Sequence, residues 1–283
     1  MEALVSPRWV LARMYESDLV IVDCRFQLGQ PEAGRLAYDA AHIPGAVYLD
    51  LERDLSAPLG EHGGRHPLPR PEELARTLGR AGIGNDARVV AYDDEGGMNA
   101  ARLWWLLRWL GHDRVAVMDG GFAAWTAGGF PVNDARRTVV PASFTPSVRS
   151  ELLADAGEVR RALGEPGVLL VDSRDASRFA GIHEPIDAQA GHIPGAVNRF
   201  WKDLLAEGSG HYKSEPQLRE QLAPVTAALD AGREAIVYCG SGVSACPNLL
   251  ALHLLGYPQA KLYAGSWSDW ISYSENPIAT GEE

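Results

Sequence analysis

The hexapeptide His-Ile-Pro-Gly-Ala-Val occurs twice in this chain, at residues 42–47 and again, letter for letter, at residues 192–197. A second pair of matching segments precedes it at nearly the same spacing. Leu-Val-Ile-Val-Asp-Cys-Arg spans residues 19–25, and Val-Leu-Leu-Val-Asp-Ser-Arg spans residues 168–174. Two long matches at one spacing indicate the duplication of a whole folding unit. We therefore expect the two halves of the chain to share one fold.

The length of the chain agrees with two domains of ordinary size. Its 283 residues divide into copies of about 140 residues, and 46% hydrophobic residues are enough to build a core in each. Residues 133–149 contain two prolines and three arginines and show little periodicity, which is typical of a linker. We predict an N-terminal domain over residues 1–135, a linker over 136–150 and a C-terminal domain over 151–283.

Short apolar runs alternate with helical patterns in both halves. The runs predict strands at residues 19–23, 89–92, 115–118, 169–172, 236–238 and 261–263. The helical patterns cover residues 72–80, 100–110 and 248–255. This alternation indicates parallel sheets with helices on both faces. The expected fold class is α/β, with two tandem domains from an internal duplication, each a mainly parallel sheet flanked by helices.

Composition and charge exclude several classes of function. The formal net charge of -11, without any block of lysines and arginines, argues against a nucleic-acid partner. The most apolar stretch, residues 103–110, is short and contains Arg108, so we expect no membrane span. Glu2 and the lack of a long apolar core over residues 1–14 argue against a signal peptide. The three cysteines form no disulfide framework, and the expected location is the cytoplasm.

The strongest candidate for a reactive group is Cys239, which follows an apolar run at residues 235–238. It opens the loop Cys-Gly-Ser-Gly-Val-Ser-Ala at residues 239–245. The two glycines allow successive N–H groups to turn toward one point, and the helix that follows adds the positive end of its dipole. In open α/β sheets the site lies at the carboxyl ends of the strands, where Cys239 falls. We therefore expect a cradle for an anion on sulfur and a thiolate nucleophile.

The first copy lacks this cysteine. Residues 117–125 align with residues 262–270 at an offset of 145, and the same offset places Asp94 opposite Cys239. A carboxylate cannot carry out sulfur chemistry. We therefore expect the N-terminal domain to be catalytically inactive and the C-terminal domain to be the catalytic one.

The chain resembles the two-domain rhodanese family of sulfurtransferases over nearly its whole length. The resemblance rests on the tandem halves, the repeated His-Ile-Pro-Gly-Ala, the Cys-Gly-Ser-Gly-Val-Ser-Ala-Cys loop and the closing Gly-Ser-Trp-Ser-Asp-Trp at residues 265–270. The loop is similar to the Cys-Gly-Ser-Gly-Val-Thr type of 3-mercaptopyruvate sulfurtransferases, rather than the Cys-Arg-Lys-Gly-Val-Thr type of thiosulfate sulfurtransferases. The resemblance implies that Cys239 takes up a sulfane sulfur as a persulfide and passes it to cyanide or to a thiol, including that of a thioredoxin-like protein. It also implies that no metal or organic cofactor is needed.

The resemblance assigns roles to further residues. It implies a relay in which Ser241 meets His66 and an acidic residue of the other domain, which is Glu52 here where an aspartate is usual. Arg178 falls where the family places its substrate-binding arginine, and a planar guanidinium suits a carboxylate. The loop residues expected to bind the substrate are Gly240, Gly242, Val243, Ser244 and Ala245.

One departure from the family pattern leaves the sulfur donor open. Many 3-mercaptopyruvate enzymes carry a second arginine after a Glu-Pro pair, but here Glu184 and Pro185 are followed by Ile and Asp. Arg199 and Lys202 are candidates to replace the lost charge. The neutral hydroxyl of Ser241 suits a keto group better than a dianion, which favours 3-mercaptopyruvate as the donor, with thiosulfate as the alternative.

The residues repeated in both halves predict structure rather than catalysis, because one half lacks the nucleophile. We expect Arg25 and Arg174 to form ion pairs with neighbouring aspartates, and His42 and His192 to support tight turns.

Two other classes of function remain as alternatives. One is a non-catalytic module that binds sulfur or an anion. The other is a thiol oxidoreductase, which would need a resolving cysteine near Cys239, although the Gly-Ser-Gly at residues 240–242 rules out a Cys-x-x-Cys pair. A Cys-x5-Arg phosphatase uses a similar cradle, but the arginine it needs is replaced here by Ala245, which argues against that activity.

Overall fold

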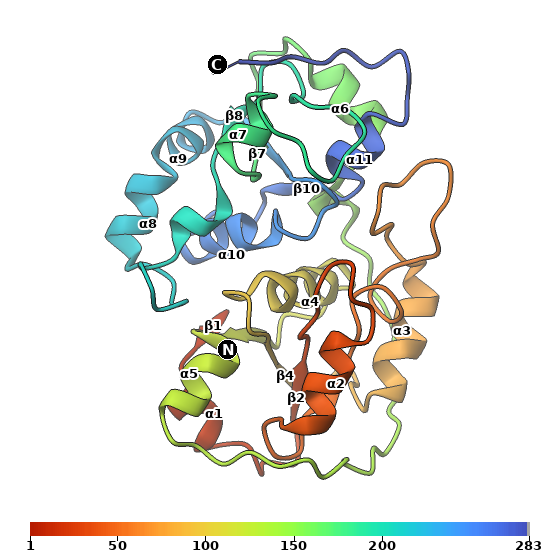
Figure 1. Ribbon diagram of the computed structural model, residues 1–283, viewed down its shortest axis with the longest axis vertical. Coiled ribbons are helices and arrows are strands. Elements are labelled where there is room, and N and C mark those ends of the chain that lie inside the picture. The colour runs from red at the N-terminus through yellow and green to blue at the C-terminus, as the bar shows by residue number, and fades with distance from the viewer. Residues whose placement is uncertain (282–283) are drawn as a thin grey trace. The chain divides into compact units, whose positions relative to one another are not determined.

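The computed structural model describes residues 1–281, which form two five-stranded sheets of the same design (Figure 1). The strands of the first sheet are β1 (Leu4–Val5), β2 (Leu19–Asp23), β3 (Val47–Tyr48), β4 (Arg88–Tyr92) and β5 (Val115–Met118). Those of the second are β6 (Leu153–Ala154), β7 (Val168–Asp172), β8 (Val197–Asn198), β9 (Glu234–Tyr238) and β10 (Lys261–Tyr263). The order β1-β5-β4-β2-β3 recurs as β6-β10-β9-β7-β8, and the pairs are parallel. The predicted fold class is confirmed.

Helices connect the strands in both sheets. In the first half they are α1 (Pro7–Leu11), α2 (Ala33–Ala40), α3 (Pro71–Arg80), α4 (Met98–Trp109) and α5 (Gly121–Ala127). In the second half they are α6 (Ala156–Ala162), α7 (Ala176–Phe179), α8 (Glu215–Gln221), α9 (Ala223–Asp230), α10 (Cys246–Leu254) and α11 (Ser266–Trp270). Two short 3-10 helices, η1 (Ser150–Leu152) and η2 (Trp201–Leu204), complete the second half.

The predicted strands all exist, and their starts shift by at most two residues. Their apolar sequences follow from burial on both faces, since all five residues of β2 are buried. Helix α10 begins at Cys246 rather than at the predicted residue 248. Pro247 lies in its opening turn, where a missing N–H costs little. This start brings the helix directly behind the loop that follows β9.

The described chain forms two compact units that differ from a simple cut between the repeats. The N-terminal unit comprises residues 1–57, 69–149 and 205–212, and the C-terminal unit comprises residues 58–68, 150–204 and 213 onward. The boundaries predicted at 135 and 150 cut the chain between the two copies. They do not include the exchange of two short segments, because residues 58–68 belong to the C-terminal unit and residues 205–212 to the N-terminal unit. The segment 58–68 matters for the site, because it carries His66.

The predicted linker, residues 136–150, contains no helix or strand before Ser150 opens η1. It belongs to the N-terminal unit through Arg149 and forms backbone bonds with that unit. Ala142 donates to the Gly79 carbonyl at 2.9 Å, and Ser147 donates to the Leu110 carbonyl at 2.9 Å.

The repeated Asp-x-Arg segments form the same buried ion pair at the end of β2 and of β7. Arg25 bonds Asp23 through Nε and Nη2, and Arg174 bonds Asp172 in the same way. Each guanidinium also donates to a backbone carbonyl, at 2.6 Å in both copies. A buried charge is stable only when it is paired in this manner. The structural reading of these arginines is confirmed.

The repeated histidines also have structural surroundings. His42 is fully buried and stacks on Tyr38, and His192 is fully buried and stacks on Phe179. In each case Nδ1 contacts the backbone carbonyl of the residue on which the ring stacks. Both histidines therefore support the connection between a helix and the next strand, as predicted.

Over residues 1–281, no helix is long and apolar enough to cross a membrane.

Candidate active site

Cys239 lies directly after β9, a strand in the middle of the second sheet, and its side chain is 1% exposed. The N–H of Gly242 donates to Cys239 Sγ at 3.1 Å. The carbonyl of Cys239 accepts the N–H of Trp267 at 2.9 Å, so the first residues of α11 hold the turn. One backbone donor of the predicted cradle, the N–H of Gly242, is therefore directed at the sulfur.

The turn requires glycine at residue 242. Its φ of +76° lies in the left-handed region, and a Cβ added there would meet the Ala264 carbonyl oxygen at 2.2 Å. The added side chain would clash with the backbone of Ala264, so any other residue at 242 would displace the N–H that bonds Cys239 Sγ. The other predicted loop residues lie in the same turn, and their roles in binding remain predictions: Gly240, Val243, Ser244 and Ala245.

Ser266 is a further polar neighbour of Cys239, and the sequence patterns did not reveal it. Its hydroxyl accepts the N–H of Cys239 at 3.0 Å, donates to the Tyr263 carbonyl at 2.8 Å and lies 4.0 Å from Cys239 Sγ. Its φ is 56°, and it is the one non-glycine residue with positive φ in the described part of the chain. Holding a serine there costs on the order of 1–3 kcal/mol. In the alignment of the two copies, Gly121 occupies this position, with a φ of 57°. That replacement of glycine by serine was the signal in the sequence.

Ser241 and His66 form a buried pair. Nδ1 of His66 lies 2.8 Å from Ser241 Oγ, and the two residues are 4% and 7% exposed. The sequence comparison predicted that these residues would meet, although 175 positions separate them along the chain. A hydroxyl in the loop that follows Cys239 is therefore coupled to an imidazole, which can accept or donate a proton.

The segment that carries His66 is tied to the C-terminal unit by its own backbone. The N–H of Gly63 donates to the Asp269 carboxylate at 2.6 Å, and the N–H of Arg65 donates to Ser268 Oγ at 3.1 Å. Asp269 also accepts the hydroxyl of Tyr263 at 2.6 Å. These bonds to α11 and to the end of β10 hold residues 58–68 in the unit that contains Cys239.

Glu52, the predicted acid of the relay, lies in the turn after β3 in the N-terminal unit. Its backbone N–H donates to Asp50 Oδ1 at 2.9 Å, and the residue is exposed. Its role toward His66 remains a prediction.

Arg178, the predicted donor-binding residue, lies on α7 within a cluster of charges. It bonds Glu184 and Asp187 at 2.9 Å each, and the side chains of both acids are 4% exposed. Glu184 also accepts backbone N–H groups from Ile186 and Asp187 at 3.0 Å. The Glu-Pro-Ile-Asp sequence therefore supplies two buried carboxylates that orient Arg178.

Arg65 is the second arginine of this cluster, and the sequence analysis missed it. Its guanidinium pairs with Asp187, which also holds Arg178. A Cβ added to Gly240 would meet Arg65 Nη2 at 2.8 Å and Arg178 Nη2 at 3.6 Å, so both guanidiniums border the residue after Cys239. Burial lowers the pKa of Arg65, and the nearby Cys239 sulfur opposes this effect. Arg65 directly precedes His66 in the sequence, which was the available signal.

The two candidates for a replacement cation make other contacts. Arg199 donates to the carbonyl of Asn198 at 2.6 Å, and burial lowers its pKa. Lys202 lies over the Trp201 ring, with Nζ 5.6 Å from the ring centroid. The cation that accompanies Arg178 beside Gly240 is therefore Arg65.

The first copy places Asp93, not Asp94, at the position of Cys239. Asp23 pairs with Tyr92 in the first sheet, as Asp172 pairs with Tyr238 in the second, so Asp93 and Cys239 are the next residues of equivalent strands. The carbonyl of Asp93 accepts the N–H of Phe122, as that of Cys239 accepts the N–H of Trp267. The first copy has one residue more than the second between this position and the aligned segments at 117–125 and 262–270. The offset of 145 taken from those segments therefore pointed to Asp94, one position too far along the chain.

The Asp93 carboxylate fills the cradle of the first copy. It is fully buried and accepts four backbone N–H groups at 2.8–2.9 Å. The donors are Glu95, Gly97, Asn99 and Ala100. Burial raises the pKa of Asp93, and these bonds oppose the rise. Asp94 is exposed and lines a separate cavity with Arg25.

The other two cysteines, Cys24 and Cys246, are also buried. Cys24 is buried, and burial raises the pKa of its thiol well above the usual range, which disfavours a thiolate. Cys246 is buried at the start of α10, and its Sγ lies 3.4 Å from the Gly242 carbonyl oxygen. Within residues 1–281, no group of three or more histidine, cysteine or acidic side chains is placed to hold a metal ion.

Comparison with known proteins places these features in a family. The family model "Rhodanese-like domain" matches twice, over residues 6–128 and 155–273. The chain is 46% identical to the "Probable 3-mercaptopyruvate sulfurtransferase" of Pseudomonas aeruginosa, over 99% of this chain and 98% of that protein. It is 34% identical to the thiosulfate sulfurtransferase of Gallus gallus, over 95% of this chain and 93% of that protein. Among solved structures, Escherichia coli SseA, a 3-mercaptopyruvate sulfotransferase with the rhodanese fold, matches with a TM-score of 0.81 and 31% identity. That match covers 95% of this chain and all of the other.

Proposed function

Because the chain belongs to the rhodanese family, with two such domains in tandem, we propose that it is a sulfurtransferase that takes sulfur from 3-mercaptopyruvate through a persulfide on Cys239. The persulfide sulfur then passes to a thiol, including that of a thioredoxin-like protein, or to cyanide. We expect this sulfur transfer to take place in the reducing environment of the cytoplasm. The alternative donor is thiosulfate, the substrate in the name of the Gallus gallus relative.

The observation that carries this proposal is the pairing of Ser241 with His66 beside the cradle of Cys239. A thiolate alone could accept sulfur from many donors. A hydroxyl coupled to an imidazole can additionally donate to the keto oxygen of 3-mercaptopyruvate as charge develops there. Thiosulfate has no keto group, so this pair has no equivalent use with it.

In the first half-reaction, the Cys239 thiolate attacks the sulfur of 3-mercaptopyruvate. The S–S bond forms while the C–S bond breaks, and the C–S electron pair goes to carbon as the enolate of pyruvate. The Ser241 hydroxyl, with His66 behind it, stabilises the enolate oxygen, and the enolate carbon then takes up the proton released from the donor thiol. The N–H of Gly242, which donates to Cys239 Sγ, stabilises the negative charge of the thiolate before this attack.

In the second half-reaction, an acceptor thiolate or cyanide attacks the outer sulfur of the persulfide. The S–S bond breaks, and its electron pair returns to Cys239 as the thiolate. Both half-reactions exchange one bond to sulfur for another, so the cycle is balanced without an external oxidant.

The charges near Cys239 also support a donor with one negative charge. Arg65 and Arg178 are already paired with Glu184 and Asp187, so this cluster is close to neutral. A donor carboxylate has to share the two guanidiniums with the built-in carboxylates. The single charge of 3-mercaptopyruvate is easier to accommodate there than the two charges of thiosulfate.

The decisive experiment compares kcat/KM for the two donors, with cyanide as the acceptor, in wild type, Cys239→Ala and Cys24→Ala. We expect a preference for 3-mercaptopyruvate, a loss of at least ~1000-fold in Cys239→Ala, and little change in Cys24→Ala, which removes a buried thiol outside the cradle. Transfer that survives in Cys239→Ala would contradict the mechanism. A preference for thiosulfate would contradict the donor and keep the nucleophile.

The donor assignment has a second test in Asp187→Asn. Removing one built-in carboxylate leaves Arg65 and Arg178 with excess positive charge. The ratio of kcat/KM for thiosulfate to that for 3-mercaptopyruvate is expected to rise about tenfold, because the dianion gains more from that charge. An unchanged ratio would show that the cluster does not select the donor.

A further inference from the structure

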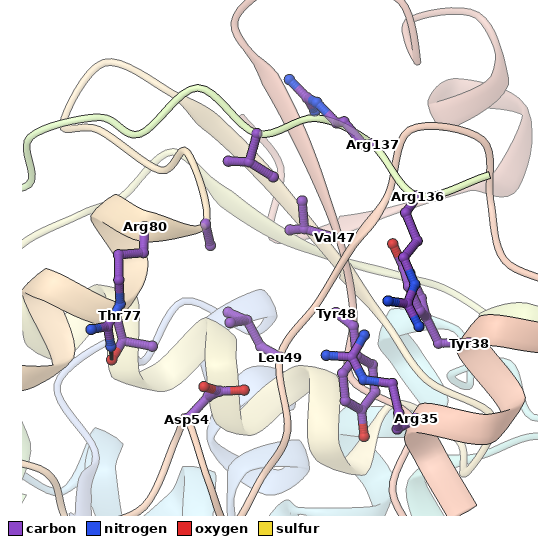
Figure 2. Close-up of a pocket in the computed structure, with 12 residues that line it drawn as sticks. Arg35, Tyr38, Val47, Tyr48, Leu49, Asp54, Thr77, Arg80, Arg136 and Arg137 are labelled. Carbon is purple, nitrogen blue, oxygen red and sulfur yellow. Dashed lines mark hydrogen bonds between the residues drawn. The ribbon is translucent and has the colours of Figure 1, made fainter. Parts of the chain in front are cut away.

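The N-terminal unit contains a cavity of about 300 Å³ that the sulfur chemistry does not use (Figure 2). Its lining residues all belong to that unit, whereas Cys239 and its loop belong to the other. Four arginines line it, together with one acidic residue, Asp54. The arginines are Arg35, Arg80, Arg136 and Arg137. A concentration of cations is notable in a chain with a net charge of -11, because it opposes the overall field of the protein.

The cations come from three separate segments and reach the cavity from opposite sides. Figure 2 shows Arg35, from α2, beside Arg136, from the linker, while Arg80, at the end of α3, lies across the cavity next to Thr77. Arg137 extends away from this group. Three guanidiniums thus border the same space, although the sequence separates them by more than 40 residues in each case.

Two of the three guanidiniums are held in position by their neighbours. Arg35 lies over the Tyr48 ring, with Cζ 4.6 Å from its centroid, and its Nη1 lies 3.9 Å from Asp39. Arg136 bonds the same Asp39 carboxylate at 2.9 Å. Preorganised guanidiniums bind an anion at a smaller entropic cost than free ones, because less rotamer freedom is lost.

The third guanidinium has spare donor capacity. Arg80 donates to Thr77 Oγ1 at 3.1 Å, which uses one of the five N–H donors of the group. Asp54 is anchored by the N–H of Asp50 at 2.8 Å. Burial raises the pKa of Asp54, while Arg35 and Arg80 both lower it, so the charges of these two arginines act at one place in the cavity.

Part of the remaining wall is apolar, with Val47, Leu49, Ala81 and Val139 among the lining residues. The volume is at the lower end of the range for small-molecule sites. Guanidiniums on opposite sides can form several charge-assisted bonds to one tetrahedral group, and the apolar walls can contact a short carbon skeleton. From this combination we infer that the cavity is a binding site for a small anion that carries a phosphate group.

The site is separate from the proposed sulfur transfer, so its test measures binding rather than turnover. Isothermal titration of the full chain with inorganic phosphate and with glycerol 3-phosphate, at constant ionic strength, compares wild type with Arg35→Gln and Arg80→Gln. We expect saturable binding with a Kd below about 1 mM, weakened about tenfold in each variant. Tighter binding of glycerol 3-phosphate identifies a phosphate ester as the ligand, and equal binding identifies the free phosphate group; both outcomes support the site.

Two control variants separate this cavity from other positive regions. Arg76→Gln removes an exposed arginine of α3 that does not line the cavity, and it should bind phosphate like wild type. Arg178→Gln alters the cluster beside Gly240, and it should also keep this binding. The inference is overturned if no saturable binding occurs, if Arg35→Gln and Arg80→Gln bind like wild type, or if only Arg178→Gln loses binding. Thermal unfolding of each variant without ligand shows whether it is folded.

Discussion

The loop after β4 and the loop after β9 leave equivalent strands, but different side chains accept the N–H groups of their turns. In the first copy, the Asp93 carboxylate takes four backbone N–H groups and is fully buried. In the second copy, Cys239 Sγ takes the N–H of Gly242. In both copies, the side chain that follows the strand accepts backbone N–H groups of its loop. The buried carboxylate of the first copy gives that loop a structural role, whereas we propose that the sulfur of the second copy makes its loop a site.

The same comparison extends to the residue that closes the turn. Gly121 in the first copy and Ser266 in the second have nearly the same φ, 57° and 56°. Glycine adopts this conformation without strain, but serine does not. The second copy therefore retains strain in order to keep a hydroxyl 4.0 Å from Cys239 Sγ.

The largest effect is expected from placing the acceptor of the first copy in the second. Cys239→Asp should abolish sulfur transfer, by at least ~1000-fold in kcat/KM, because a carboxylate cannot form a persulfide. The fold should survive, since the first copy folds around this side chain in the equivalent loop. Turnover assays and circular dichroism check both parts. Transfer near the wild-type level would contradict the proposed role of Cys239, and loss of the folded state would contradict the equivalence of the two cradles.

The next largest effect is expected at the hydroxyl of Ser241, in the loop of the second copy. Ser241→Ala should lower kcat/KM for 3-mercaptopyruvate about 100-fold and for thiosulfate much less, because the hydroxyl paired with His66 acts on a keto group. Steady-state kinetics with both donors measure the difference. Equal losses for the two donors would remove Ser241 from the mechanism proposed here.

A third prediction concerns the structural role of the first cradle. Asp93→Asn replaces one acceptor oxygen of the carboxylate by an NH2 group, which cannot accept, and this leaves buried N–H groups without a partner. The free energy of unfolding should fall by about 2 kcal/mol. The matched control is Asp94→Asn, at an exposed neighbour, which should change it little. Denaturant titrations measure both variants. A larger loss of unfolding free energy in Asp94→Asn than in Asp93→Asn would indicate that Asp94, not Asp93, is the structural counterpart of Cys239.

The smallest effect is expected from converting the second copy to the glycine of the first. Ser266→Gly should lower kcat about tenfold, because the hydroxyl that bonds the Cys239 N–H is lost. Thermal stability should not fall by an equivalent amount, since relief of the strained φ offsets the lost hydrogen bonds. Activity and stability that fall together would indicate a purely structural serine.

Much of this protein could be predicted from local sequence. The strands are short apolar runs, and the cysteine loop is recognisable because its glycines are close to Cys239 in the chain. The pair of Ser241 and His66 was predictable only through a family resemblance, since no local pattern links residues 175 positions apart. Arg65 was missed for the same reason, because its partners Asp187 and Gly240 lie far from it in the sequence.

The duplication, the parallel sheets and the choice of Cys239 as the candidate nucleophile follow from the sequence alone, because repeats, apolar periodicity and glycine-rich turns act over short stretches of chain. Tertiary structure decided which aspartate replaces that cysteine, since a one-residue difference between the copies is visible only in the pairing of β2 with β4 and of β7 with β9. It also decided that residues 58–68 join the C-terminal unit and bring Arg65 to Gly240. Those outcomes depend on hydrogen bonds and ion pairs between distant segments, which no local pattern encodes.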